Sequence, residues 1–124
     1  MRLCITTATT EAPARLDRRF GRSPFLTFVD TETNETQIEE NSLADGASGV
    51  GAQVAQLVAQ RGATAVITGQ IGPSAFAVLD AAEIATYTTT ATTVAEALTL
   101  FREGRLDSAQ APTGPGHHGG SRPR

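Results

Sequence analysis

Several residue types are scarce or missing in this sequence of 124 residues, and each absence narrows the functions open to it. Cys4 is the one cysteine, which excludes an internal disulfide framework and a cysteine-rich metal site. Lysine is missing altogether, so the lysine-containing phosphate loop of nucleoside triphosphatases is excluded. No apolar run reaches membrane-spanning length, and the threonine-rich stretch after residues 3–5 does not fit a signal peptide. We therefore expect a cytoplasmic protein with no membrane partner.

The charge balance argues against general binding of nucleic acid. The net charge is -3 and the isoelectric point is about 5.3, whereas nucleic-acid-binding domains usually carry a basic stripe and a high isoelectric point. All ten basic residues are arginine. Arginine suits the clamping of oxyanions, but a coding bias towards GC-rich codons explains the missing lysine at least as well, and we favour the bias.

The pattern of apolar and turn residues predicts one α/β domain over residues 1–107. A short strand around Val66 and Ile67 ends at Gly69 and leads into a helix, and the rest of the chain is organised around this unit. Further strands are expected at 2–6, 25–30, 35–40 and 84–87, with 25–40 forming a hairpin whose carboxylate-rich second strand lies at the sheet edge. Helices are expected at about 50–62, 73–82 and 93–104.

Capping residues mark the ends of these helices. Ser48 and Gly62 would cap the first helix, and Gly72 precedes the proline that begins the second. Thr93 and Glu96 form a T-x-x-E capping box at the third. We expect the backbone to bend sharply at Gly72, where a positive φ would require glycine, so a side chain there should destabilise the domain.

Residues 108–124 are rich in proline and glycine and lack large apolar side chains. Such a composition cannot offset the entropy of ordering, which predicts a disordered tail that contributes nothing to folding. His117 and His118 in this tail are candidate metal ligands, although two adjacent histidines on a polar tail are more often solvated. Cys4 is a third candidate, although a lone cysteine within an apolar strand is more often a small buried hydrophobe.

Four loops are predicted to meet at one end of the sheet. If the strand at 25–30 alone runs against the others, loops 7–24, 41–51, 69–72 and 88–92 all leave the end where ligands bind in open α/β sheets. Two helix N-termini and an arginine-containing loop meet there, which favours an anionic ligand. For each glycine of these loops, turn and cap geometry alone is the alternative explanation. The sequence Gly49-Val50-Gly51 lacks the third glycine of a dinucleotide fingerprint.

Three stretches match the pattern of a known family: RRFGRSPFLTFVDTET at 18–33, DGASGVGAQVAQLVAQRGATAVITGQIGPSAF at 45–76, and TTVAEALTLFREGRL at 92–106. The most specific pieces are FGRSP at 20–24 and GQIGPSAF at 69–76. On these residues, the chain resembles the dinitrogenase iron-molybdenum cofactor biosynthesis family, which includes NifX-like proteins and the C-terminal part of NifB-type proteins. The resemblance covers about residues 1–107. It implies a ribonuclease-H-like, three-layer α/β/α fold with a mixed five-stranded sheet in the order 3-2-1-4-5 and an antiparallel second strand.

The resemblance also implies a carrier or chaperone for an anionic iron-sulfur or molybdenum-containing cluster, and no enzymatic activity. Other cofactor-assembly proteins would be its partners, and it would be a monomer or a weak homodimer. Arg19 stands where the family often has histidine, which argues against a histidine-ligated cluster at this loop. With Cys4 expected to be buried, backbone N–H groups and arginine would hold the cluster mainly through charge. The implied cofactor-binding residues are Arg19, Phe20, Gly21, Arg22, Gly46, Ser48, Gly49, Gly51, Gly69, Gln70, Ile71 and Gly72.

Two other functions stay open at this point. The same loops could bind a phosphorylated small molecule in a regulatory or catalytic module, or the chain could be a plain interaction domain. Iron, molybdenum or sulfide in anaerobically purified protein would favour the carrier, whereas stabilisation by a phosphate ester in a thermal-shift screen would favour the second function.

Overall fold

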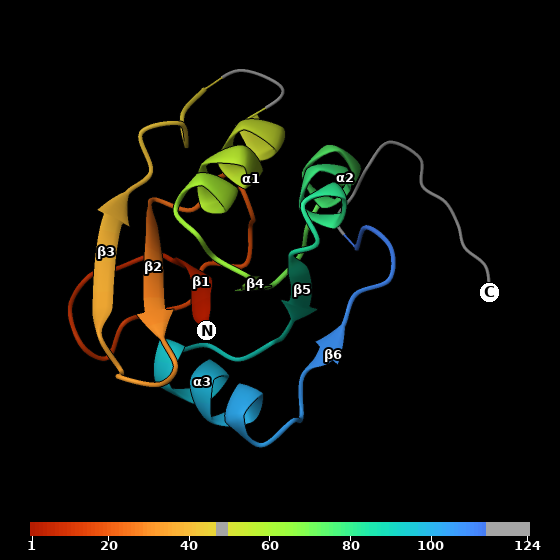
Figure 1. Cartoon of the computed structure of the whole chain (residues 1–124). Coiled ribbons are helices and arrows are strands. Elements are labelled where there is room, and N and C mark those ends of the chain that lie inside the picture. The colour runs from red at the N-terminus through yellow and green to blue at the C-terminus, as the bar shows by residue number, and fades with distance from the viewer. Residues whose placement is uncertain (47–49, 114–124) are drawn as a thin grey trace.

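The computed structural model describes residues 1–46 and 50–113. Within these residues, strands and helices follow one another as a mixed α/β chain (Figure 1). The elements are β1 (Arg2–Thr7), β2 (Phe25–Asp30), β3 (Thr36–Glu40), α1 (Val50–Gln60), β4 (Ala65–Thr68), α2 (Pro73–Ala81), β5 (Ala85–Thr88), α3 (Val94–Arg102) and β6 (Asp107–Ser108).

All the strands of this described part join one sheet in the order β3-β2-β1-β4-β5-β6. β2 pairs antiparallel with both β1 and β3, while β4 pairs parallel with β1 and with β5. The predicted order 3-2-1-4-5 and the antiparallel second strand are therefore confirmed. The predicted number of strands is corrected, because β6 adds a short antiparallel partner to β5.

Helices cover both faces of the sheet, which confirms the three-layer α/β/α architecture. In Figure 1, α1 and α2 lie side by side on one face and α3 lies on the other. β1 contributes side chains to the apolar clusters on both faces of the sheet, because successive side chains of a strand point to opposite faces. Cys4 joins the apolar cluster beneath α1 and α2, whereas Leu3 and Ile5 join the cluster on the α3 side.

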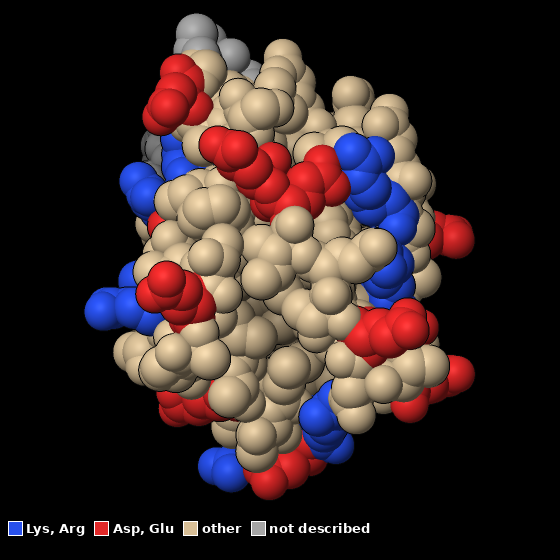
Figure 2. All heavy atoms as spheres, turned by 90° about the vertical axis from the view of Figure 1, so that its left-hand side faces the viewer, with Lys and Arg blue, Asp and Glu red and all other residues tan. Residues whose placement is uncertain are grey.

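β3 is an exposed outer strand, as predicted from its carboxylates. Four of its five residues are exposed, and the Ile38 residue is 44% exposed. Figure 2 views this edge and shows carboxylates and arginines around an uncharged centre. Charged side chains beside an open edge oppose pairing with other strands.

The predicted helix ends are found where the structure describes them. Oγ1 of Thr93 accepts a hydrogen bond from the Glu96 backbone N–H at 3.1 Å, and the Glu96 carboxylate accepts one from Thr92 N–H at 3.2 Å. This pair completes a capping box at α3. Gly62 has φ +82, as expected after α1. The prediction that Gly72 needs a positive φ is wrong. Its φ is -81 in extended backbone, and a Cβ there would meet nothing within 4 Å.

Residues 107–113 form a strap that differs from the predicted disordered tail. After β6, Ala109 N–H donates to the Thr86 carbonyl at 2.7 Å. The strap then reaches the start of α2, where Thr113 N–H donates to the Ile71 carbonyl at 2.9 Å and Thr113 Oγ1 accepts from Ile71 N–H at 3.2 Å. The Ile71 residue is 1% exposed, and buried backbone groups need such partners, which explains why a polar segment is ordered here.

None of the helices in the described residues is long and apolar enough to cross a membrane.

Candidate functional site

The strand register brings the four loops to one end of the sheet. Thr7 at the end of β1 pairs with Phe25 at the start of β2, and Phe25 also pairs with Glu40 at the end of β3. Thr68 at the end of β4 pairs with Thr88 at the end of β5. Four loops therefore leave from the same edge, where ligands bind in open α/β sheets. They are 8–24, 69–72, 89–93 and the loop after β3, of which the structure describes 41–46.

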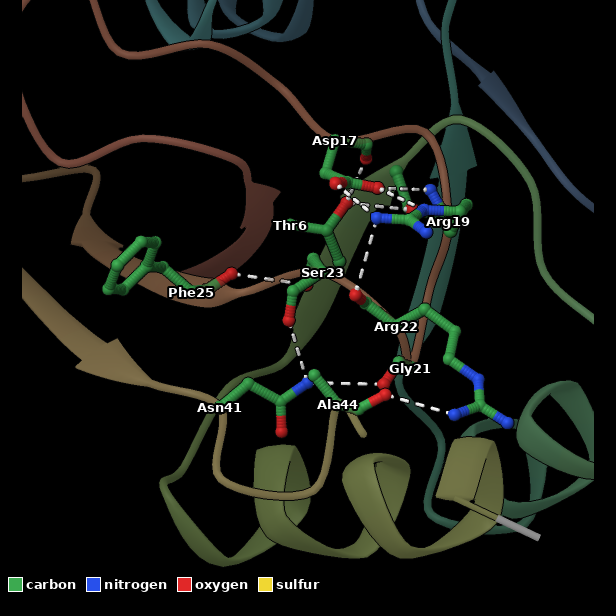
Figure 3. A network of polar contacts seen from close by, with 10 residues as sticks. Thr6, Asp17, Arg19, Gly21, Arg22, Ser23, Phe25, Asn41 and Ala44 are labelled. Atoms are coloured by element: carbon green, nitrogen blue, oxygen red, sulfur yellow. Dashed lines mark hydrogen bonds and ion pairs between the residues drawn. The ribbon is translucent and has the colours of Figure 1, made fainter. Parts of the chain in front are cut away.

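A buried polar contact holds the long loop after β1 against the sheet. The Thr6 hydroxyl donates to the carbonyl oxygen of Asp17 at 2.7 Å (Figure 3). It also lies 2.8 Å from the Thr68 hydroxyl. The Thr6 carbonyl accepts the Asp17 N–H at 2.9 Å. Both threonines are fully buried, so their hydroxyls need these partners. The loop is consequently fixed at its middle by the ends of β1 and β4.

Asp17 is the partner of Arg19, which changes the role expected for this arginine. The Arg19 guanidinium donates to both carboxylate oxygens of Asp17 at 3.1 and 3.0 Å, and the Arg19 backbone N–H donates to one of them at 2.9 Å (Figure 3). Burial alone would raise the pKa of Asp17, but the hydrogen bonds and charge of Arg19 outweigh burial and hold that pKa below its ordinary value. Arg19 thus stabilises the loop through Asp17.

The loop after β4 packs directly on the loop after β1. Phe20 N–H donates to the Gln70 carbonyl at 3.2 Å, and Gln70 N–H donates to the Arg18 carbonyl at 2.7 Å. A Cβ on Gly69 would lie 2.6 Å from the Arg18 Cα, so only glycine permits this approach. The predicted motif residues Phe20, Gly69 and Gln70 are therefore in contact.

Asn41 and Arg22 tie the loop after β3 to the same place, and the role of Asn41 was not predicted. The buried Asn41 side-chain amide donates to the carbonyls of Gly21 and Ser23 at 3.1 and 2.9 Å. The Arg22 guanidinium donates to the carbonyls of Ala44 and Gly46 at 2.9 and 2.7 Å. Figure 3 shows these bonds, apart from the one to Gly46, bridging the chain around Gly21 to the 41–46 loop.

Gly21 places this turn against the first turn of α1. Its φ is +96, a left-handed conformation that favours glycine, and a Cβ there would lie 3.0 Å from the Gly51 Cα. The close approach explains why small residues occur at both positions.

A cavity of about 360 Å³ lies between this turn and the starts of the two helices. Neither α1 nor α2 has an acidic residue in its first turn, and the described lining includes an arginine and no carboxylate. Gly72 has no side chain that could cap α2, so no N-cap side chain accepts hydrogen bonds from the first N–H groups of this helix. The site therefore suits an anion. It is lined by Phe20, Arg22, Val50, Gly51, Gly72, Pro73, Ser74 and Ala75.

A neighbouring cavity of about 520 Å³ has mixed charge. Arg19 and Arg22 line it together with Glu40 and Asp45. Two carboxylates oppose an anion at this position, so we assign the candidate site to the smaller cavity.

The predicted site residues divide by location. Phe20, Arg22, Gly51 and Gly72 line the smaller cavity, while Arg19 lines the mixed-charge one. Five others do not line the smaller cavity but hold its loops in place by close approach, hydrogen bond or turn geometry: Gly21, Gly46, Gly69, Gln70 and Ile71. Ser48 and Gly49, and the metal candidates His117 and His118, lie outside the described residues.

Cys4 is separated from the cavity by its burial in the sheet. Its side chain belongs to the apolar cluster beneath α1 and α2 and is 0% exposed. Burial raises the pKa of the Cys4 thiol far above its ordinary value, so the thiolate that metals bind is disfavoured. Within residues 1–46 and 50–113, no group of three or more histidine, cysteine, aspartate or glutamate side chains is placed to hold a metal ion.

Residues 1–104 match the family model described as dinitrogenase iron-molybdenum cofactor. The chain belongs to this family. An uncharacterized protein of Methanocaldococcus jannaschii is 36% identical over 96 residues, which cover 75% of this chain and 81% of that protein.

Solved structures support the same relationship. The apo form of the orange protein from Desulfovibrio gigas is 31% identical with a TM-score of 0.86, covering 91% of this chain and 96% of that one. A putative NifB protein from Thermotoga, solved by NMR, is 33% identical with a TM-score of 0.76, covering 86% of this chain and 91% of that one. In both cases the aligned region extends well beyond the motif segments.

Proposed function

We propose that this protein is a small, non-enzymatic carrier of an anionic metal-sulfur cluster of the iron-sulfur or iron-molybdenum type. One observation carries the proposal: the cavity of Phe20, Arg22, Gly51 and Gly72 combines two helix starts with an arginine and has no carboxylate among its described lining residues. The cluster is cargo that the protein receives and hands on to other cofactor-assembly proteins.

The described residues fit this cargo through charge and shape. Backbone N–H groups at helix starts bind anions, and sulfide-rich clusters of net negative charge present acceptors to them. Arg22 is already fixed by the Ala44 and Gly46 carbonyls, so the cavity wall keeps its shape when the cargo is absent. Because Cys4 is buried, the protein holds the cluster without a thiolate ligand from the described core.

The relatives support a role in which the protein binds a cofactor-like group. The orange protein of Desulfovibrio gigas is known in an apo form, which is a protein without a group that it otherwise binds. The Thermotoga protein is a putative NifB protein, and the family is described by the iron-molybdenum cofactor. A binding role for the shared loops accounts for all three descriptions.

The experiment fills the cavity and leaves the fold intact. Gly72 has extended backbone with open space at its Cβ, so Gly72→Leu should fold while placing a side chain in the cavity. Ala81→Leu is the matched control, because Ala81 is exposed at the other end of α2. Each protein is incubated anaerobically with ferrous iron and sulfide, or with tetrathiomolybdate, and bound metal is measured after gel filtration.

We expect wild type and Ala81→Leu to retain metal and Gly72→Leu to retain little, with similar melting temperatures for all three. Retention should weaken with salt, since the contacts are electrostatic. Equal retention by Gly72→Leu and wild type would reject this cavity. Failure of the wild type to retain any metal, together with stabilisation by a phosphate ester, would replace the cluster by a phosphorylated small molecule.

A further inference from the structure

The outer side of β3 carries unpaired backbone groups from alternate residues. Among the described residues no strand lies outside β3, whose outer side faces the viewer in Figure 2. Asp30 N–H donates to the Glu35 carbonyl at 2.9 Å, and Asn41 N–H donates to the Pro24 carbonyl at 2.8 Å. Because hydrogen-bonded pairs alternate along an antiparallel ladder, the odd-numbered residues of 35–41 face β2. The N–H and C=O groups of the even-numbered residues therefore point away from the sheet. These residues are Thr36, Ile38 and Glu40.

Ile38 stands at the centre of this outer side. It pairs with Thr27 of β2, which pairs with Ile5 of β1, so the three side chains lie on the face of the sheet that α3 covers. Ile38 is nevertheless 44% exposed, and Met1 is the other large apolar residue exposed among those that the structure describes. Neither proline nor lysine, which commonly protect an edge strand, occurs in β3. The strand therefore presents backbone groups and one apolar side chain to another strand.

The carboxylates of this strand fit a second copy of the same strand in one register. If two β3 strands pair antiparallel with Ile38 opposite Ile38, the outward backbone groups of each copy meet those of the other. Every carboxylate then lies opposite an uncharged residue that can form hydrogen bonds. The opposed residues are Glu40 with Thr36, Glu39 with Gln37, and Glu35 with Asn41.

Neighbouring registers bring glutamates together. A shift of two residues one way places Glu39 opposite Glu39, and a shift of two the other way places Glu35 opposite Glu39. Like charges directly opposite one another destabilise a pair of strands. A shift of one residue would leave the outward backbone groups without partners. The charges that oppose pairing at this edge in general therefore permit the register centred on Ile38.

The charge of Glu39, next to this centre, is already compensated within each copy. The Arg61 guanidinium donates to both Glu39 carboxylate oxygens at 2.8 and 2.9 Å. The Arg2 guanidinium donates to the Gln37 side-chain oxygen at 2.7 Å, so the amide nitrogen of Gln37 is the group that can donate to an opposing carboxylate. The residues beside the centre of the paired strands thus bring no uncompensated charge together.

We propose that this protein forms a weak homodimer by antiparallel pairing of two β3 strands, with Ile38 opposite Ile38 at the two-fold axis. The donors, acceptors and carboxylates of this edge complement a copy of themselves, which is what a two-fold interface requires. The two sheets join edge to edge, and the sheet ends that carry the candidate cavities point in opposite directions. The dimer therefore does not depend on the proposed cargo. One short strand from each copy buries little surface, so the association is weak and depends on concentration.

Sedimentation equilibrium of the full chain without added metal, from about 10 μM to 1 mM, measures the association. Amide hydrogen exchange at low and high concentration identifies the strand that pairs. Ile38→Pro removes an outward N–H while keeping the bonds to β2, since an edge strand tolerates proline where the N–H faces solvent. Thr36→Arg places a positive charge opposite Glu40 of the second copy, and Thr36→Glu places a negative charge there. Thr99→Arg, at an exposed position of α3, is the matched control for the change in net charge.

We expect wild type to dimerise with a dissociation constant between about 1 μM and 1 mM, the range of weak contacts. The outward amides of Thr36, Ile38 and Glu40 should exchange more slowly at high concentration. Ile38→Pro and Thr36→Glu should weaken the dimer. Thr36→Arg should tighten it by about 2- to 30-fold, because the two-fold axis creates two opposite-charge pairs. Thr99→Arg should match wild type.

A wild-type chain that stays monomeric at about 1 mM would overturn the inference. A dimer whose affinity is unchanged by Ile38→Pro and by both Thr36 substitutions would use another surface, which would also overturn it. Equal tightening by Thr36→Arg and Thr99→Arg would assign the effect to net charge and reject the register. If Ile38→Pro fails to fold, the opposite effects expected of Thr36→Arg and Thr36→Glu decide the question.

Discussion

Gly69 and Arg18 approach so closely that a Cβ on Gly69 would lie 2.6 Å from the Arg18 Cα and 2.8 Å from the Arg18 carbonyl oxygen. That same carbonyl accepts the Gln70 N–H at 2.7 Å. The contact joins the loops after β1 and β4, so it fixes where Phe20 stands relative to the start of α2. Backbone cannot yield as a flexible side chain can, and glycine at 69 is therefore required for packing.

Gly69→Ala should lower the free energy of unfolding by about 1 to 3 kcal/mol, the usual cost of forcing extra volume into a packed site. Gly72→Ala is the matched control three residues later in the same loop. Because Gly72 is extended and open, this control should change stability by less than about 0.5 kcal/mol. Urea unfolding of the three proteins measures both values. Equal effects of the two substitutions would contradict the close approach.

Asp17→Asn should lower stability at neutral pH, and the loss should fade in acid. The folded-state pKa of Asp17 lies below its ordinary value, so its carboxylate adds stability above about pH 4, and this stability disappears as pH falls through the folded pKa. Because Arg19 is 57% exposed, solvent screens the pair, and we expect a difference of about 1 kcal/mol at pH 7. Unfolding measured from pH 7 to pH 2.5 should show wild type and variant converging.

Asp30→Asn checks that the effect of Asp17→Asn on its own loop is not a general effect of removing a carboxylate. The pKa of Asp30 is also below its ordinary value, through the backbone N–H groups of Glu32 and Thr33, but Asp30 lies in the opposite turn of the sheet. Asp17→Asn should reduce the hydrogen-exchange protection of Arg19 N–H, and Asp30→Asn should leave it unchanged. Loss of this protection in both variants would contradict the local role of Asp17.

The regular elements of this fold were predictable because their signals are local. Leu3, Cys4 and Ile5 form a continuous apolar run, which marks a strand buried on both faces. Thr93 and Glu96 stand at the spacing of a capping box, and the structure forms one. The order of the strands came from the family resemblance, whose motifs span most of the domain, and it was confirmed.

The remaining features depend on contacts that local patterns do not encode. β6 and the strap have no apolar periodicity that could have predicted them. They are held by hydrogen bonds to the backbone of Thr86 and Ile71, which are far away in the sequence. The requirement for glycine fell on Gly69 instead of Gly72, because the approach of Arg18 is a tertiary contact.

Two buried polar residues of the site carry a weak local signal that could have found them. Asp17 and Asn41 each accept a backbone N–H from two residues further along, at Arg19 and Leu43 respectively. This Asx pattern is typical of aspartate and asparagine that organise loops. Their further partners, the Arg19 guanidinium and the Gly21 and Ser23 carbonyls, became known only from the structure.

Arg22→Ala should loosen the 41–46 loop and weaken cluster retention, whereas Arg18→Ala should do neither. Both substitutions remove one positive charge from the same loop, but only Arg22 donates to the Ala44 and Gly46 carbonyls. Hydrogen exchange of the 41–46 amides reports the loop, and metal content after gel filtration reports retention. If the two variants retain equally little metal, net charge alone governs binding and the hydrogen bonds of Arg22 to the 41–46 loop have no role.

Removing the strap should destabilise the domain, while removing only the residues after it should not. Truncation after Thr113 keeps every strap hydrogen bond that the structure shows, so its melting temperature should match that of the full chain. Truncation after Leu106 removes β6 and the partners of Ile71, and we expect a loss of about 1 to 3 kcal/mol, the cost of leaving buried backbone groups unpaired. Identical melting curves for both truncations would show that the strap contributes nothing to stability.

The Cys4 thiol should be inert in the folded protein and unnecessary for cargo. Cys4 is 0% exposed and burial raises its thiol pKa, so iodoacetamide at pH 8 should not modify the native protein and should modify it fully in denaturant. If the cluster is held by charge contacts at the proposed cavity, Cys4→Ala should retain it as wild type does. Mass spectrometry follows the alkylation, and metal analysis after anaerobic loading follows retention. Thr27→Ser is the control, because it also changes a buried position of the sheet. Rapid alkylation of the native protein would contradict the inert thiol. Retention that is abolished by Cys4→Ala but kept by Thr27→Ser would make the thiol a ligand and reject a site built on amides and arginine.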